Sequence, residues 1–495
     1  MNSEAIEQAL LASLPEIVLL AAACLLLLVD LLLKGRRVDL IAGLSILIVL
    51  TVAALTWVLE VQADYGSPVY NNMFVADPYA VFFKMVFYIA TVLTILISSN
   101  YLKLEDEARG EYFVLLLFAL CGMMLMASAI DLISIYVGME LLALSMYVLT
   151  GFLKKDQRSN ESALKYLILS ATATCLMLYG ISLFYGLCGT TQLNGITDAL
   201  TTPVATAAVT NTLGSDPAII LATLFLLGGF AFKIAAVPFH MWAPDVYEGA
   251  PTPITAFMSV GSKAAGFAIL LRIFVQALAP LEDVWLLVFG IIALATMAVG
   301  SLVALVQTNI KRLLAYSSIA HAGFALLGLI AGGANGVASV LLYLLIFTFM
   351  NMGIFTVIVA MKREDDASEL ISDYSGLSRQ QAVLALLMLL FLFSLAGIPP
   401  TAGFIAKFYI IIALIEAEYI LLAVAAVLFS AIAAFFYLRI VMLMYMREPV
   451  RKLSRDNSLN QPLALRISLA VTGIATLGIG LFPAWFLARA LAAVF

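Results

Sequence analysis

Long apolar runs alternate with short polar segments along the whole chain. Most runs are about 20 residues long, the length at which an α-helix crosses the ~30 Å hydrocarbon core of a bilayer. The alternating ten-residue strands typical of membrane β-barrels do not appear. The pattern predicts fourteen transmembrane helices, at 14–33, 38–58, 79–99, 112–128, 130–152, 162–188, 217–241, 254–276, 283–305, 311–330, 336–361, 383–415, 419–444 and 465–489.

Composition supports an all-α polytopic membrane protein in which residues 1–495 form a single transmembrane domain. The chain is 64% hydrophobic and only 12% charged, whereas soluble domains have about 25% charged residues. The N-terminus has no basic region and begins with Glu4 and Glu7, so the first apolar run reads as a retained helix rather than a cleaved signal peptide.

Neither the cysteines nor the glycines indicate a cofactor site in this chain. The four cysteines form no C-x-x-C pair, so metal or iron–sulfur ligation is not expected, and we interpret them as small buried apolar residues. No glycine-rich phosphate loop follows a strand pattern, so no nucleotide site is predicted. The cysteines are Cys24, Cys121, Cys175 and Cys188.

Basic residues outside the predicted helices lie only in the odd-numbered loops. Positive charge stays cytoplasmic during insertion, so these loops are predicted to be cytoplasmic and both termini periplasmic. The even-numbered loops hold no basic residue, including the long segment 189–216, which is expected to be an outer surface loop. The 17 loop residues are Lys34, Arg36, Arg37, Lys103, Arg109, Lys154, Lys155, Arg158, Lys311, Arg312, Lys362, Arg363, Arg379, Arg447, Arg451, Lys452 and Arg455.

The other nine basic residues fall inside the predicted spans, and depth separates them. Six lie near span ends, where long side chains can reach the headgroups. These six are Lys84, Lys165, Arg272, Arg439, Arg466 and Arg489. Depth alone therefore gives Lys165, one turn into its helix, the same interpretation as the others.

A second set of ionisable residues lies deep in the spans, comprising Glu140, Lys233, Lys263, His321 and Lys407. Each buried charge costs on the order of 2.5–3.5 kcal/mol on insertion scales. A structural ion pair, or neutral lysines within the bundle, is one interpretation. One glutamate cannot neutralise three lysines, however, and carboxylates, imidazoles and buried amines exchange protons readily. The set therefore favours a line of proton-exchanging groups.

Two predicted helices contain breaks that resemble each other. The span at 383–415 is about 50 Å long at 1.5 Å per residue, too long for a straight crossing. It contains Gly-Ile-Pro-Pro at 397–400, which removes backbone hydrogen bonds. The segment 232–238 matches the segment 393–399 in pattern, and each segment ends at a proline. Non-helical backbone at membrane depth is tolerated only inside protein or beside a wet cavity.

A second match places these breaks in an internal repeat. The segment 162–167 parallels 339–344, one helix before each break. Helices 4–8 (111–276) and 9–13 (283–446) are therefore predicted to be two copies of a five-helix unit. Five is odd, so the copies would be inverted in the membrane, as in many ion transporters. Helices 1–3 (1–110) precede them, and 447–495 supplies a cytoplasmic loop and helix 14.

Three motifs resemble a known family. Residues 238–253, PFHMWAPDVYEGAPTP, resemble the loop after helix 7 in the N subunits of bacterial NADH–quinone oxidoreductase, respiratory complex I. Residues 311–323 and 397–407 resemble helices 10 and 12 of the antiporter-like membrane subunits generally. The resemblance covers essentially the whole chain, and the PDVYEGAPTP run favours N subunits over the sister subunits L and M.

The resemblance implies a role for each deep residue. Glu140 and Lys233 match a glutamate–lysine pair that controls the proton affinity of the lysine. Lys263 matches the central connecting lysine, and Lys407 matches the lysine on the exit side. His321 falls between the latter two, and Lys165 matches the helix 6 lysine of N subunits, which weighs against its interpretation as a headgroup-reaching side chain.

The function implied is proton translocation in the bacterial inner membrane, driven by electron transfer from NADH to quinone in other subunits. FMN, iron–sulfur clusters and quinone would be held there, with none in this chain, and neighbouring antiporter-like subunits would be the partners. One alternative is a subunit of a multi-subunit cation/proton antiporter or membrane-bound hydrogenase. A second alternative is a membrane scaffold that conducts no protons.

Overall fold

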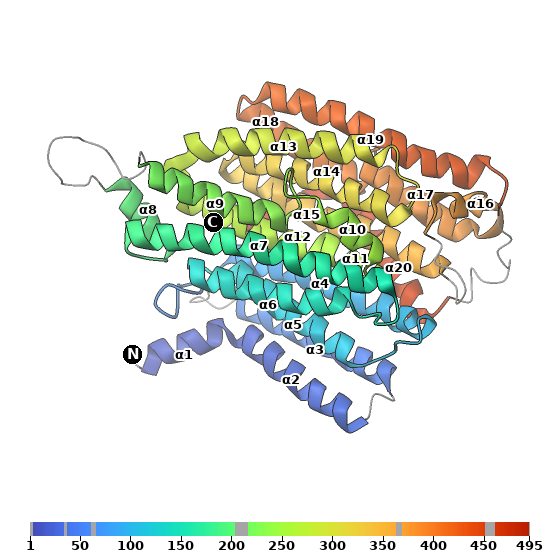
Figure 1. Cartoon of the computed structure of the whole chain (residues 1–495), viewed down its shortest axis with the longest axis horizontal. Helices are drawn as coiled ribbons and strands as arrows, with labels where there is room; N and C mark the ends of the chain where they lie inside the picture. The colour runs from blue at the N-terminus through green and yellow to red at the C-terminus, as the bar shows by residue number, and fades with distance from the viewer. Residues whose placement is uncertain are drawn as a thin grey trace.

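The computed structural model describes residues 3–33, 37–60, 66–202, 216–362, 369–450 and 461–494. Within these ranges, twelve helices are long and apolar enough to cross a membrane, and two shorter apolar helices, α9 and α17, begin the two broken spans. An apolar helix therefore lies at each of the fourteen predicted spans, although the bounds differ from the prediction at the broken ones. The helices lie side by side in one bundle, with α2 at one edge and α19 at the other (Figure 1).

The helices of the first half are α1 (Ser3–Ala12), α2 (Leu14–Leu33), α3 (Val38–Glu60), α4 (Pro78–Leu104), α5 (Glu111–Ser128), α6 (Leu132–Thr150), α7 (Gln157–Cys188), α8 (Leu193–Thr201), α9 (Pro217–Lys233), α10 (Trp242–Gly249), α11 (Thr252–Phe257), η2 (Met258–Ser262), α12 (Lys263–Leu270), η3 (Leu271–Ala277) and η4 (Ala279–Leu281). Those of the second half are α13 (Glu282–Ala304), α14 (Ile310–Ala331), α15 (Gly333–Met361), η5 (Ile371–Tyr374), α16 (Leu377–Gln380), α17 (Ala382–Ala396), α18 (Ala402–Glu416), α19 (Ile420–Met446), α20 (Leu463–Leu481) and α21 (Pro483–Ala492).

Several short helices were not predicted. The segment expected to be an outer surface loop contains α8, whose residues Leu193, Ile196 and Leu200 form one buried apolar stripe; residues 203–215 lie outside the described part of the chain. The final span, predicted as one helix at 465–489, is divided into α20 and α21. Pro483 lacks a backbone N–H and occupies the first turn of α21, so it cannot continue α20.

The starts of α6 and α14 repeat the same local structure at opposite ends of the bundle. Asp131 caps α6 by accepting hydrogen bonds from two backbone N–H groups, and Asn309 caps α14 in the same way. The first residue of α6 then donates to the carbonyl of Thr191 (2.9 Å), and the first residue of α14 donates to the carbonyl of Glu369 (2.7 Å). Each cap thus contacts the segment that follows the third helix of its copy, as an inverted repeat requires.

Close glycine contacts repeat as well. An added Cβ at Gly122 of α5 would lie 2.6 Å from the backbone nitrogen of Leu142 in α6. An added Cβ at Gly300 of α13 would lie 2.5 Å from the backbone nitrogen of Ala320 in α14. Only glycine allows the first two helices of each copy to approach this closely.

Loops that alternate along the chain gather at opposite ends of the bundle. At one end, Phe74 forms a bridge with Ala129, and Thr197 donates to the carbonyl of Ala277 (2.9 Å). At the other end, the side chain of Arg158 lies 3.6 Å from that of Glu369. In Figure 1, α8 marks the first end and α16 the second. The geometry therefore separates even-numbered from odd-numbered loops as the basic-residue pattern predicts.

Two basic residues expected to reach the headgroups are instead buried in ion pairs, so that prediction was wrong for them. The Nζ of Lys84 is fully buried, 2.6 Å from an oxygen of Glu16 in α2. Arg272 is 2% exposed and makes a bidentate contact with Asp77 at 2.9 Å. Pairing with a carboxylate from a distant segment offsets the cost of burying each charge.

Of the four remaining residues at span ends, Lys165 is described with the candidate site below. Arg439 is half-buried and donates to the carbonyls of Leu305 and Gln307 after α13, whereas Arg466 and Arg489 are exposed. The cysteine prediction was wrong in part, because only Cys121 is buried, while Cys24 and Cys175 are exposed and Cys188 is half-buried. The described residues contain no group of three metal-ligating side chains.

Candidate functional site

The first broken helix ends earlier than predicted, and Lys233 is the last residue of α9 rather than an interior one. The backbone then leaves the helix until α10 begins at Trp242. The indole N–H of Trp242 donates to the carbonyl of Phe232 (2.9 Å), and the hydroxyl of Thr296 accepts from the N–H of Val237 (2.9 Å). Side chains therefore satisfy backbone groups that the break exposes.

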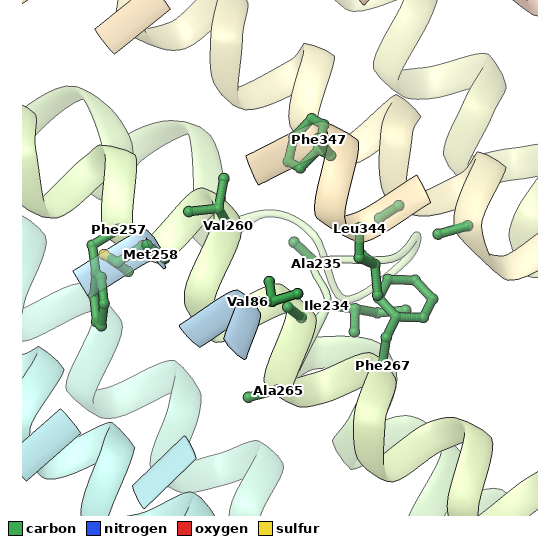
Figure 2. Packing of buried hydrophobic residues seen from close by; sticks show 14 of the residues in the cluster. Val86, Ile234, Ala235, Phe257, Met258, Val260, Ala265, Phe267, Leu344 and Phe347 are labelled. Carbon is green, nitrogen blue, oxygen red and sulfur yellow. The ribbon is translucent and has the colours of Figure 1, made fainter. Parts of the chain in front are cut away.

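The break is enclosed in protein. Ile234 and Ala235 pack beside Ala265 and Phe267 of α12 (Figure 2). An added Cβ at Gly266 would lie 2.9 Å from Ile234 and 3.6 Å from Cγ of Lys233, so α12 passes directly over the end of α9. This arrangement meets the requirement that irregular backbone at membrane depth be buried.

Glu140 and Lys233 face a shared internal cavity. Glu140 lies near the middle of α6, and together the two residues line a small cavity of about 10 Å³ between α6, α7 and α9. Among the described residues, neither Oε1 of Glu140 nor Nζ of Lys233 has a hydrogen-bond partner. Both atoms are buried, so each carries a desolvation cost that a partner in the cavity would relieve.

Lys263 lies at the centre of the bundle, directly after the π-helical turn η2. Its Nζ donates to both the carbonyl and the hydroxyl of Ser318 in α14, each at 2.6 Å. No acidic residue contacts it among those the structure describes. Lys263 is therefore held by neutral acceptors, which solvate the ammonium and also leave an amine well placed when it is deprotonated.

His321 is one turn further along α14 and contacts two tyrosines. Its Nδ1 lies 2.5 Å from the hydroxyl of Tyr343 in α15, and its Nε2 lies 3.2 Å from the hydroxyl of Tyr437 in α19. The same Tyr437 hydroxyl hydrogen-bonds to Ser317. A neutral imidazole has one donor and one acceptor nitrogen, so this chain of hydroxyl and imidazole groups can exchange protons in either direction.

Lys407 closes the second break. It lies in α18, and its Nζ donates to the carbonyls of Leu395 (2.9 Å) and Ala396 (3.1 Å), which α17 leaves free where it ends. The same Nζ donates to the hydroxyl of Ser430 (2.9 Å) and lies 5.0 Å from the ring centre of Phe324 in α14. Cation–π contact adds to the stabilisation of its charged form.

One face of α14 joins these groups. Ser317, His321 and Phe324 follow at helical spacings of four and three residues, and Ser318 lies beside them. Ser317 and His321 contact Tyr437. Phe324 contacts Lys407, and Ser318 contacts Lys263. The structure thus places His321 on the helix that contacts both Lys263 and Lys407, and α12, which begins at Lys263, also passes over Lys233.

Lys165 is not part of this set. It is 42% exposed, and its Nζ lies 2.8 Å from both Glu161 and Asp245. Arg312 contacts Asp245 at 3.0 Å and Glu248 at 2.8 Å. These side chains surround a polar pocket of about 540 Å³ at the end of the bundle that holds the odd-numbered loops.

The comparisons with known proteins assign the family. Residues 129–433 match the family model described as NADH:quinone oxidoreductase/Mrp antiporter, TM. The NADH-quinone oxidoreductase subunit N 2 of Rhizobium meliloti is 56% identical over 487 residues, which cover 98% of each chain. The chain belongs to the subunit N family of NADH-quinone oxidoreductase. It is therefore a proton-translocating membrane subunit of complex I, as the motifs implied.

Solved structures agree with the subunit N assignment. A chain of respiratory complex I from Thermus thermophilus, solved with bound aureothin, is 30% identical with a TM-score of 0.77, over 95% of this chain and 98% of that one. A chain of the Mrp complex from a Dietzia species has a TM-score of 0.80 at 23% identity, over 98% and 96% of the two chains, and so shares the fold alone. Identity to the subunit N relative therefore decides against the antiporter alternative.

Sequence reasoning missed the neutral members of the subunit N site. Tyr343, Tyr437, Ser317, Ser318 and Ser430 each contact a predicted site residue. Tyr343 falls in a segment that the repeat analysis singled out, so its position carried a signal. Ser317 and Ser318 likewise fall in the 311–323 motif. Tyr437 and Ser430 look like ordinary helix-interior residues, because hydroxyls in apolar helices usually bond to their own backbone.

Proposed function

We propose that protons move through this subunit along Lys263, His321 and Lys407, and that the pair Glu140–Lys233 controls access to that line. The observation that carries the proposal is the position of α14, which holds His321 and contacts both Lys263, through Ser318, and Lys407, through Phe324. From Ser317 through Tyr437 and His321 to Tyr343, each neighbour lies within hydrogen-bond distance, as exchange of a proton between hydroxyl and imidazole requires. We propose that water completes the steps from this set to Lys263 and to Lys407.

The Glu140–Lys233 cavity supports a switching role. A carboxylate beside an amine in a low-dielectric space attracts it strongly when it is an ammonium, so the charge state of one group depends on the other. Since no direct hydrogen bond fixes the pair, a small shift of α6 or α9 changes this attraction. A charge arriving at Glu140 would then release or recapture the proton on Lys233.

Lys407 is proposed as the exit group because it lies at the second break. Its Nζ donates to two carbonyls of α17 and to the hydroxyl of Ser430, and a neutral amine has two N–H donors instead of three, so loss of the proton would leave one of these three acceptors without its lysine donor. Water that reaches the break would supply the missing hydrogen-bond donor, since the end of a helix leaves carbonyl groups that need one. The basic-residue pattern supports a periplasmic location for both termini, in the inner membrane of a bacterium.

Lys165 is proposed to act at the cytoplasmic surface. It holds Asp245 in α10, and α10 is tied to the end of α9 through the Trp242–Phe232 hydrogen bond. A change of charge in this surface cluster would therefore be transmitted to Lys233. Neighbouring antiporter-like subunits are the proposed partners, with NADH oxidation and quinone reduction, and their cofactors, in other subunits of the complex.

Neutralising Lys263 tests the proposal. Lys263→Met keeps the length of the side chain but removes the exchangeable proton, so proton pumping in inside-out vesicles should fall while the complex stays assembled. Lys103→Met is the matched control, because Lys103 pairs with Asp39 on the surface. Normal pumping by an assembled Lys263→Met complex would refute the relay. Loss of assembly would support the scaffold alternative instead.

A further inference from the structure

A large apolar groove lies between α17 and α20, outside the proton site. Its volume is about 670 Å³, and leucines from both helices line it. It runs from Gln461 and Arg466 at one end to Pro399, Pro400 and Thr401 at the second break. Its apolar wall includes Leu386, Leu390, Phe393, Leu469, Ile474 and Leu477.

Arg466 gives this groove a polar end. It is the one charged residue that lines the groove, lies in the first turn of α20 and is exposed. Among the described residues, no carboxylate pairs with it. Its end of the groove adjoins the odd-numbered loops, which are predicted to be cytoplasmic, and the cytoplasmic leaflet is the one rich in anionic lipids.

The dimensions match one leaflet. From Arg466 to Leu477, α20 rises about 16 Å at 1.5 Å per residue, and half of a ~30 Å hydrocarbon core is about 15 Å. An acyl chain whose phosphate lies at Arg466 would therefore end near the bilayer centre, beside Pro399 and Pro400.

We propose that this groove binds an anionic phospholipid of the cytoplasmic leaflet, with its phosphate on Arg466 and one acyl chain between α17 and α20. The chain end touches the break that presents carbonyls to Lys407. Near that point α20 also meets the break directly, since an added Cβ at Gly480 would lie 2.2 Å from the carbonyl oxygen of Pro400. The proposal does not depend on the proton route.

Photo-crosslinking in the intact complex tests this site. The complex is placed in nanodiscs that contain phosphatidylglycerol with a diazirine near the end of one acyl chain, and labelled peptides are identified by mass spectrometry. Labels should concentrate on residues 386–400 and 469–477. A phosphatidylcholine probe with the same chain should label about fivefold less, because one basic residue near a membrane contributes about 1 kcal/mol.

Two variants with matched controls sharpen the result. Arg466→Gln should reduce phosphatidylglycerol labelling about fivefold, whereas Arg489→Gln, which removes an exposed arginine stacked on Trp57 and Trp485, should not. Ala470→Phe should fill the groove and abolish labelling there. Val471→Phe places the same phenyl side chain at an exposed position of α20 outside the groove and should leave labelling unchanged.

Three outcomes would overturn the proposal. Equal labelling by the two lipids, or labelling indifferent to Arg466→Gln, would show that no anionic headgroup is recognised. Labels spread evenly over the lipid-facing helices would show that there is no site. A photoreactive residue at position 470 that crosslinks to another subunit would show that protein fills the groove.

Discussion

Ser318 occupies in the second repeat the position that Glu140 occupies in the first. In each copy, a glycine contact fixes the register of the first two helices, Gly122 against α6 and Gly300 against α14. Aligned on these contacts, Glu140 and Ser318 coincide. The first copy therefore places a carboxylate in the cavity of Lys233, whereas the second offers Lys263 a neutral hydroxyl and carbonyl. We propose that this asymmetry gives the two lysines different tasks.

Converting Ser318 to glutamate should remove that difference. A carboxylate beside Lys263 would stabilise its ammonium form and hold the proton there, since opposite charges attract strongly where the dielectric is low. Ser318→Glu should therefore slow proton pumping more than Ser318→Ala, which loses one hydrogen bond worth about 1 kcal/mol, or about fivefold in rate. Proton uptake by inside-out vesicles measures both. Faster pumping in Ser318→Glu than in Ser318→Ala would contradict the proposal that Lys263 needs neutral acceptors in order to release its proton.

Glu140 should matter through its charge rather than its shape. Glu140→Gln keeps the side-chain volume but removes the attraction for Lys233, so coupled pumping should drop while the complex remains assembled. Glu448→Gln is a suitable control, because the side chain of Glu448 is 91% exposed and lies outside the proposed site. The proton-to-electron ratio of each variant is the measurement, and an unchanged ratio in Glu140→Gln would remove the pair from the mechanism.

Tyr437 should be needed for its hydroxyl. Tyr437→Phe preserves the packing against Phe436 but breaks the connection between Ser317 and His321. Loss of a relay contact worth 1–3 kcal/mol should slow proton transfer on the order of tenfold. Tyr445→Phe, on the same helix but more exposed, should have no effect. Wild-type pumping by Tyr437→Phe would show that protons bypass this hydroxyl.

Much of the fold can be predicted from the sequence, because each span is recognisable from its own residues. A run of 20 apolar residues is enough to predict a helix, and Pro399–Pro400 is enough to predict a break. Lys84 and Arg272 escaped prediction because their partners, Glu16 and Asp77, lie 68 and 195 residues away in the chain. Depth in a span gives no information on such pairing.

The site was predictable only where it carries charge. Lys263 and His321 stand out in apolar helices, because a buried ionisable group is costly. Tyr437 and Ser318 cost little to bury when hydrogen-bonded, so burial marks neither of them, and Ser318 is marked only because it lies in the 311–323 motif. The environment of Lys165 could not be predicted from its own helix, because its partner Asp245 comes from a different element. The same is true of Lys84.

Membrane orientation can be tested at two exposed positions. In a cysteine-free chain within the complex, Asp198→Cys lies in α8 at the even-numbered end, and Lys155→Cys lies at the odd-numbered end, where Lys155 is largely exposed. An impermeant maleimide added to intact spheroplasts should label position 198 alone. Labelling at 155 without permeabilisation would reverse the proposed topology.

The most direct test of proton relay concerns Lys407, which has two possible roles. As a relay it must release its proton, whereas as a structural cap it need only donate to Leu395 and Ala396. Arginine retains charge and donors but is effectively never deprotonated, and methionine retains length without either.

The decisive measurement is the proton-to-electron ratio of assembled complexes carrying Lys407→Arg or Lys407→Met, with assembly followed by native gel electrophoresis. The account predicts that both variants assemble and that both pump fewer protons per NADH oxidised than the wild type. A wild-type ratio in Lys407→Arg beside a low ratio in Lys407→Met would contradict it, because a fixed positive charge would then be sufficient.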